Sequence, residues 1–180
     1  MTEYVFLDTE TTGLDDDAQV VEIAIVDDSG AVLFESFVRP TVPVNPDAQA
    51  IHGIGPEKLA SAPAWPEIAR QVRAVLEGKT VVIFNAGFDT RILQQTAEAH
   101  AAGRGVEAYD SAVKWILELR TECAMYRAAD VYGPTNQYGT ISLANAAAAA
   151  GVEFQGRAHS ATGDAATTAA LWAVMAKQVV

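Results

Sequence analysis

The sequence predicts one α/β domain in which the first strands are antiparallel neighbours and a later strand leads directly into a helix. Three apolar runs in the first 38 residues are separated by short turn-forming segments, as in consecutive hairpins. A further apolar run, residues 80–84, is followed at once by a helical pattern. The chain of 180 residues is long enough for one substantial core, so we expect a single domain over residues 1–180.

The composition limits the classes of function. The net charge is −11, from 12 Lys and Arg against 23 Asp and Glu, which argues against broad clamping of duplex nucleic acid. A small site for a nucleic-acid end stays open, provided that divalent cations lie between the two sets of negative charge. Cys123 is the single cysteine, so no internal disulfide can form. The sequence shows no membrane span and no secretory signal, and we expect a cytoplasmic protein.

The three early strands are expected at residues 4–7, 19–26 and 31–38, with a turn at 28–30. Glu22 interrupts the second of these strands. Its side chain lies either on the inner face of the sheet or toward solvent, and we favour solvent.

The rest of the chain alternates helical patterns with breaks. Residues 39–64 are rich in proline and are expected to be a long irregular segment, in which His52 is a loop histidine satisfied by backbone groups. Gly151 should end one helix, for which Ser142 is a plausible N-cap. The expected helices span residues 65–77, 89–100, 109–119, 143–150 and 164–177, with a short strand at 122–125 and a loop at 133–139.

Two acids close the first strand. Side chains alternate along a strand, so Asp8 and Glu10 point the same way if pairing continues to Glu10, about 7 Å apart along the chain. Two buried carboxylates on one face repel each other and lose hydration unless a cation neutralises them. The alternative is a solvated strand end that runs into the acidic turn at 15–17.

Two more acids lie at the ends of buried elements. Asp89 follows the strand at 80–84 in the first turns of a helix, where an acid often only compensates the helix dipole. Asp164 shares one helical stripe with Thr168, Leu171 and Met175, which predicts that its carboxylate points inward. Together with Asp8 and Glu10, these acids call for a divalent metal.

Oxygen ligands without a Cys or His cluster suit Mg²⁺ or Mn²⁺ better than zinc. Two such ions can clamp a phosphodiester, one activating water and the other stabilising the leaving oxygen. His159 lies five residues before Asp164, and its ordinary pKa suits a general base near neutral pH.

These motifs resemble those of the DEDDh 3′–5′ exonucleases, the family that includes the epsilon subunit of DNA polymerase III, ribonuclease T and oligoribonuclease. The resemblance runs from residue 4 to about 176 and rests on four motifs in order. They are DTETTGL at 8–14, IHGI at 51–54, NAGFD at 85–89, and His159 with Asp164. It implies a ribonuclease H-like mixed sheet, with antiparallel first three strands and then parallel strands, flanked by helices.

The resemblance also implies roles for residues. Asp8, Glu10, Asp89 and Asp164 would hold two Mg²⁺ or Mn²⁺ ions, and His159 would be the general base. The substrate-binding residues that it implies are Thr9, Thr11, Leu14, His52, Ile54, Asn85 and Phe88.

The sequence therefore predicts a metal-dependent exonuclease that removes nucleoside 5′-monophosphates from single-stranded 3′ ends of DNA or RNA. The alternative of another class is a non-catalytic accessory module that binds a polymerase or a nucleic-acid end. Members of the family act alone, as homodimers or on a DNA polymerase, and the sequence leaves these three states open.

Overall fold

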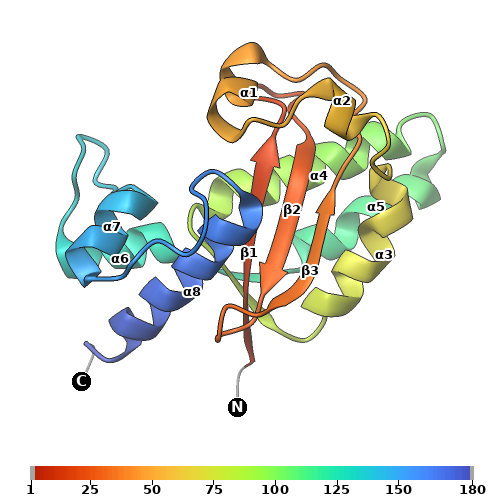
Figure 1. Cartoon of the computed structure of the whole chain (residues 1–180). Coiled ribbons are helices and arrows are strands. Elements are labelled where there is room, and N and C mark those ends of the chain that lie inside the picture. The colour runs from red at the N-terminus through yellow and green to blue at the C-terminus, as the bar shows by residue number, and fades with distance from the viewer. Residues whose placement is uncertain (1–2, 179–180) are drawn as a thin grey trace.

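The computed structural model describes residues 3–178 and places its strands in one mixed sheet of order β3-β2-β1-β4-β5 (Figure 1). β1 is antiparallel to β2, β2 is antiparallel to β3, and β4 and β5 continue the sheet in parallel from β1. The strand bounds are Tyr4–Thr11 (β1), Val20–Val26 (β2), Val32–Phe37 (β3), Thr80–Ile83 (β4) and Arg120–Cys123 (β5). The predicted change from antiparallel hairpins to parallel strands is confirmed.

Helices precede and follow the parallel strands. All five expected helices are present, as α3, α4, α5, α7 and α8, although α4, α5 and α8 each begin three residues earlier than expected. The helix bounds are Pro46–His52 (α1), Pro56–Leu59 (α2), Trp65–Leu76 (α3), Ala86–Ala101 (α4), Val106–Leu117 (α5), Ala124–Tyr132 (α6), Leu143–Ala150 (α7) and Ala161–Ala176 (α8).

The proline-rich segment is more regular than expected, because it contains the short helices α1 and α2. Asn45 caps α1 by accepting a hydrogen bond from the Asp47 backbone N–H, and Pro46 occupies the first helical position. Gly53 ends the helix in the left-handed conformation, with φ of 71°. The prolines therefore start helices here instead of excluding them.

The short strand expected at 122–125 lies at 120–123, and the next residues form α6. The strand β5 ends where its partner β4 ends, since Cys123 pairs with Ile83. The apolar side chains of Ala124 and Ala128 belong to α6 and are fully buried beneath the sheet. A short apolar run does not distinguish a strand from a buried helix, and this explains the misplaced boundary.

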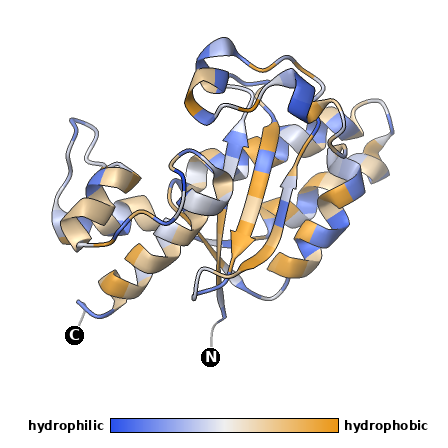
Figure 2. Ribbon diagram, in the orientation of Figure 1, coloured by the Kyte–Doolittle hydropathy of each residue, from blue (hydrophilic) through white to orange (hydrophobic). Residues whose placement is uncertain are grey.

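The sheet separates two cores because its side chains alternate between faces. Val5 and Leu7 of β1 face a core shared with α3, α4 and α5. Phe6 faces the opposite core, which includes residues of α6, α7 and α8. Figure 2 shows that β2, an interior strand of the sheet, is apolar along most of its length, as expected of a strand covered on both faces.

The last helix, α8, lies against β1 and β2 (Figure 1). Ser160 caps it, accepting from the Gly163 N–H, and the side chains of Thr168, Leu171 and Met175 are buried as predicted. Among the helices of residues 3–178, none combines the length and the apolarity that crossing a membrane requires.

Two glycines in first turns of helices provide a matched test of packing. A Cβ on Gly163 would lie 2.9 Å from the Gln155 carbonyl oxygen and closer still to that of Arg157, whereas a Cβ on Gly87 would meet no atom within 4 Å. Gly163→Ala should therefore lower the free energy of unfolding by about 1–3 kcal/mol. Gly87→Ala should raise it by about 0.4–1 kcal/mol, because alanine restricts the unfolded chain. Urea denaturation measures both, and equal effects would contradict the close packing of residues 155–157 over α8.

Candidate active site

Three carboxylates meet where the carboxyl end of β1 lies under α8. Asp8 and Glu10 continue the face of β1 that Phe6 occupies, and Asp164 comes from the first turn of α8. One carboxylate oxygen from each of the three acids lies within 4.8 Å of the other two. The predicted convergence of Asp8, Glu10 and Asp164 is therefore present, and its all-oxygen chemistry fits a hard divalent cation.

Asp89 approaches from the other side of β1, at the start of α4. The strand β1 runs past the end of β4, whose last pair is Leu7 with Ile83, so Thr9 has no strand partner on that side. Asp89 Oδ1 fills this place by accepting hydrogen bonds from the Thr9 N–H (3.1 Å) and the Thr9 hydroxyl (2.7 Å). Asp89 is buried and stands next to the three-carboxylate group without belonging to it.

The site carries uncompensated negative charge. Burial raises the pKa of Asp8 well above its ordinary value, and the neighbouring Asp89, Asp164 and Glu10 carboxylates add to the rise. Burial likewise raises the pKa of Glu10 to about 8, with Asp164 as the next cause. The pKa of Asp89 rises to about 7, mainly through burial, although the Thr9 hydrogen bonds oppose the rise. A divalent cation would remove this repulsion.

Glu22 is a further acid at the site, and the expectation that it faces solvent is wrong. It pairs with Glu10 across β1 and β2, and its half-buried side chain points toward α8. Glu22 Oε2 accepts a hydrogen bond from the Ala161 N–H at the start of α8 (3.0 Å). Its charge also raises the pKa of Asp8, Glu10 and Asp164. Glu22 thus ties the helix that carries Asp164 to the strand beside Glu10.

His159 lies in the loop that leads into α8, with an exposed side chain and a positive φ of 58°. A left-handed backbone is unusual for a residue other than glycine. The conformation lets the His159 backbone N–H donate to Asp164 Oδ1 at 3.2 Å. The loop therefore holds His159 beside the three-carboxylate group, with its imidazole open to solvent.

A cavity of about 340 Å³ adjoins the carboxylates. Its wall combines polar groups of β1 with apolar side chains from the following loop and from α1. The lining includes five predicted substrate-binding residues, Thr9, Thr11, Leu14, His52 and Phe88, together with Glu10, Gly13, Asp15, Asn45, Asp47, Ala48 and Ile51. Leu14 and Ile51 are strongly exposed for apolar residues, with 76% and 57% of their surface accessible.

His52 is held by backbone groups, as expected, and also lines the cavity. Its Nδ1 accepts from the Ile54 N–H (3.0 Å), so Nε2 carries the proton and donates to the Thr11 carbonyl (3.1 Å). Burial lowers the pKa of His52, which agrees with a neutral ring. The hydrogen bonds fasten α1 to the end of β1.

Two predicted substrate-binding residues do not line this cavity. The Ile54 side chain is buried in a small cluster with Val21 and Leu59, because Gly53 turns the chain between Ile51 and Ile54. Asn85 is exposed and precedes α4. Ile51 takes the place at the cavity that was expected for Ile54.

Comparison with known proteins places the chain in a family. Residues 5–172 match the RNase_T family, which is described as exonuclease. The chain is 38% identical over 176 residues to exonuclease CP81 of Escherichia phage 186, an alignment that covers 96% of this chain and 88% of the phage protein. The chain therefore belongs to this exonuclease family, as the motifs indicated.

Other relatives match in part or by fold. The DNA polymerase III epsilon subunit of Pasteurella multocida is 36% identical over 98 residues, which span 49% of this chain and 39% of that protein. Exonuclease X, solved with 5′ overhanging duplex DNA, superposes with a TM-score of 0.72 at 25% identity, over 98% of this chain and 92% of that one. The ribonuclease H-like fold predicted from the motifs is confirmed.

The raised carboxyl pKa values make the metal-free protein sensitive to pH. Glu10 titrates near pH 8 in the folded state and near 4.5 when unfolded, so the folded state binds more protons between these values. The free energy of unfolding should therefore fall as pH rises from 5 to 8 in EDTA, and Glu10→Gln should reduce the slope. At pH 8, Mn²⁺ should raise the melting temperature. Thermal denaturation measures each effect, and a melting temperature that increases with pH in EDTA would contradict the burial of these acids.

Glu22 and Glu35 allow a test of how α8 is held. Glu35 Oε2 accepts from the Thr162 hydroxyl at 3.0 Å, one residue beyond the contact of Glu22, but Glu35 lies on the exposed edge strand β3. Glu22→Ala should weaken Mn²⁺ binding by about tenfold, because Asp164 loses its support. Glu35→Ala should change it less than about twofold. Titration calorimetry measures the Mn²⁺ affinity of both variants. Equal losses of affinity would mean that Glu22 does not support Asp164.

Proposed function

We propose that the chain is a 3′–5′ exonuclease that uses two Mg²⁺ or Mn²⁺ ions to release nucleoside 5′-monophosphates from single-stranded ends. The observation that carries this proposal is the meeting of Asp8, Glu10 and Asp164 beside a cavity large enough for part of a nucleotide. Membership of the exonuclease family supports the reaction class. Exonuclease X, whose solved complex contains 5′ overhanging duplex DNA, supports the substrate class.

In this proposal, Asp8, Glu10 and Asp164 hold one ion, and Asp8 and Asp89 contribute to the other. Asp89 Oδ1 already accepts two hydrogen bonds from Thr9, which leaves Oδ2 for a metal or its bound water. Bound divalent ions supply an acidified water and stabilise the charge that develops on the leaving oxygen. Glu22 keeps α8, and with it Asp164, against the strand.

His159 is assigned as the general base. Its imidazole is exposed to the solvent from which the attacking water comes, and its backbone N–H is tied to Asp164. The imidazole would accept the proton of this water as the water oxygen bonds to phosphorus and the bond from phosphorus to O3′ of the penultimate nucleotide breaks, so that the phosphate leaves with the terminal nucleotide. The mobility of an exposed side chain also allows the ring to carry the proton away.

The cavity beside the acids is assigned to the terminal nucleotide. Leu14 and Phe88 provide apolar surface for the base, and the Thr9 and Thr11 strand end provides polar groups for the sugar. A pocket for one nucleotide is compatible with the net charge of −11, since only the end of the strand must approach the carboxylates. DNA and RNA remain alternative substrates within this proposal.

The assignment is tested with single strands labelled at either end, in the presence of Mn²⁺. A 3′–5′ exonuclease releases the 3′ label at once as a mononucleotide and shortens 5′-labelled strands stepwise. Asp8→Asn should reduce the rate by more than about a hundredfold, because it removes a direct ligand. His159→Ala should reduce it by about 10² to 10⁴ while Mn²⁺ binding, measured by calorimetry, is retained. Early release of a 5′ label would contradict the 3′–5′ direction of degradation. Full activity of His159→Ala would contradict the assignment of His159 as the general base.

A further inference from the structure

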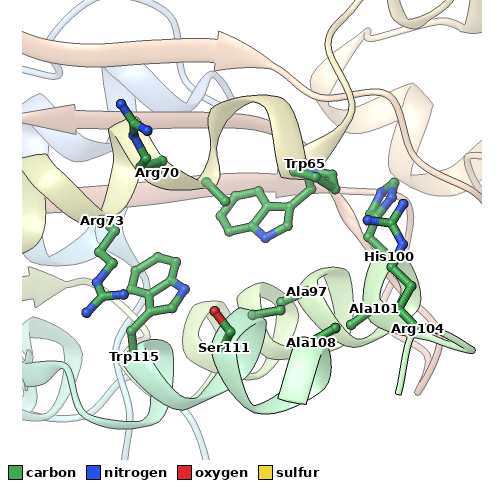
Figure 3. Close-up of a pocket in the computed structure, with 13 residues that line it drawn as sticks. Trp65, Arg70, Arg73, Ala97, His100, Ala101, Arg104, Ala108, Ser111 and Trp115 are labelled. Atoms are coloured by element: carbon green, nitrogen blue, oxygen red, sulfur yellow. The ribbon is translucent and has the colours of Figure 1, made fainter. Parts of the chain in front are cut away.

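A second cavity, of about 360 Å³, lies between α3, α4 and α5, on the face of the sheet opposite the α8 side (Figure 3). The small side chains of Ala97, Ala101 and Ala108 form part of its floor, and Trp65 and Trp115 stand at its wall. None of the residues that line it belongs to the acidic site or to the adjoining cavity. The proposed exonuclease reaction therefore assigns this second cavity no role.

The rim of this cavity is cationic. Arg70, Arg73 and Arg104 line it, and none of its lining residues is acidic. Within residues 3–178, none of these three arginines forms a salt bridge. In a chain with 23 acids and 12 basic residues, three arginines without acidic partners around one hollow call for an anionic occupant.

The two ends of the cavity differ in detail. Figure 3 shows Arg73 reaching toward Trp115 at one end, whereas Arg104 lies beside His100 at the other. His100 Nε2 is buried and has no hydrogen-bond partner among the described residues. Burial, together with the charge of Arg104, lowers the pKa of His100, so this end already resists a further positive charge.

The packing of the two tryptophans argues that the ligand of this cavity is not a nucleobase. Their rings stack on each other, with centroids 6.5 Å apart and planes 7° apart, and only 2% and 8% of Trp65 and Trp115 are accessible. Binding of a single strand relies on aromatic faces that bases can cover. Here those faces are occupied, and the free surface is a narrow apolar floor with arginines at its rim.

We propose that this cavity binds a short segment of a partner protein in which apolar side chains lie between acidic residues. An apolar centre within a polar rim that carries arginine is the composition of protein recognition surfaces. The apolar side chain would cover the partly exposed side chains of Ala69, Ala108 and Ala112. The flanking carboxylates would pair with Arg73 at one end and Arg104 at the other.

The chain contains a built-in reporter for this proposal, because it has three tryptophans. Trp172 packs in the core on the opposite face of the sheet, so its indole N–H signal serves as an internal control. The whole protein, labelled with nitrogen-15, is titrated with the blocked peptide Asp-Asp-Leu-Leu-Asp-Asp. The indole signals of Trp65 and Trp115 should shift along a saturable curve while that of Trp172 stays in place.

Matched variants and peptides decide the interpretation. Arg73→Glu with Arg104→Glu should weaken binding by about tenfold, whereas Lys114→Glu, on α5 but outside the cavity, should change it less than about twofold. The exonuclease rate of these variants should equal that of the parent chain. If Asp-Asp-Ser-Ser-Asp-Asp bound as tightly as the leucine peptide, the proposed apolar contact would be wrong. Equal shifts of all three indole signals would mean that the peptide does not bind specifically at this cavity. If an oligonucleotide shifted the Trp65 and Trp115 signals and bound more tightly than the peptide, the occupant of the cavity would be nucleic acid and not a protein segment.

Discussion

The desolvation and crowding of carboxylates at the carboxyl end of β1 form the constraint on which the site depends. Asp8 and Glu10 are forced together by strand alternation, and Asp164 and Glu22 add charge from α8 and β2. In the metal-free chain, the cost appears as the raised pKa of each of the three acids that meet there, which comes mainly from burial and is increased by neighbouring carboxylates. Stability and metal binding are therefore linked, since a cation that binds only the folded chain stabilises it.

The topology of the sheet places these carboxylates beside a cavity at the end of β1. β1 has an antiparallel neighbour on one side and a parallel neighbour on the other, and it outruns the parallel one. The unpaired Thr9 N–H is then free to receive Asp89 from α4. The strand order also reverses at β1, because β2 and β3 lie on one side of it and β4 and β5 on the other. Ligands of open α/β sheets bind in the crevice outside the carboxyl ends of strands at such a reversal. The cavity between the end of β1 and α1 occupies this position.

The two charged clusters described above have opposite sign and lie on opposite faces of the sheet. The acids of the site point toward α8, whereas Arg70, Arg73 and Arg104 surround the cavity between α3, α4 and α5. The sheet and its two apolar cores separate these groups, so the arginines do not neutralise the carboxylates. An acidic segment bound at the arginines would leave the end of β1 accessible to a nucleic-acid end.

Relations between residues close in the sequence were sufficient to predict much of the candidate site. Alternation along β1 predicted that Asp8 and Glu10 share a face, and helical spacing predicted the inward position of Asp164 with Leu171 and Met175. Ser142 was recognised as an N-cap because capping depends on neighbouring residues alone. The order of motifs along the chain identified the exonuclease family.

Other features depended on contacts between distant segments. The side of the sheet that Glu22 faces follows from its pairing with Glu10 and from the position of α8, 139 residues away at Ala161. The exchange of Ile54 for Ile51 at the cavity follows from the turn at Gly53 and from the hydrogen bond of His52 to Thr11 of β1. The sequence by itself thus determined that Asp8 and Glu10 share a face and that Asp164 points inward, because both follow from local periodicity. Only the tertiary structure decided which side chains surround them, because register and helix docking join residues far apart in the chain.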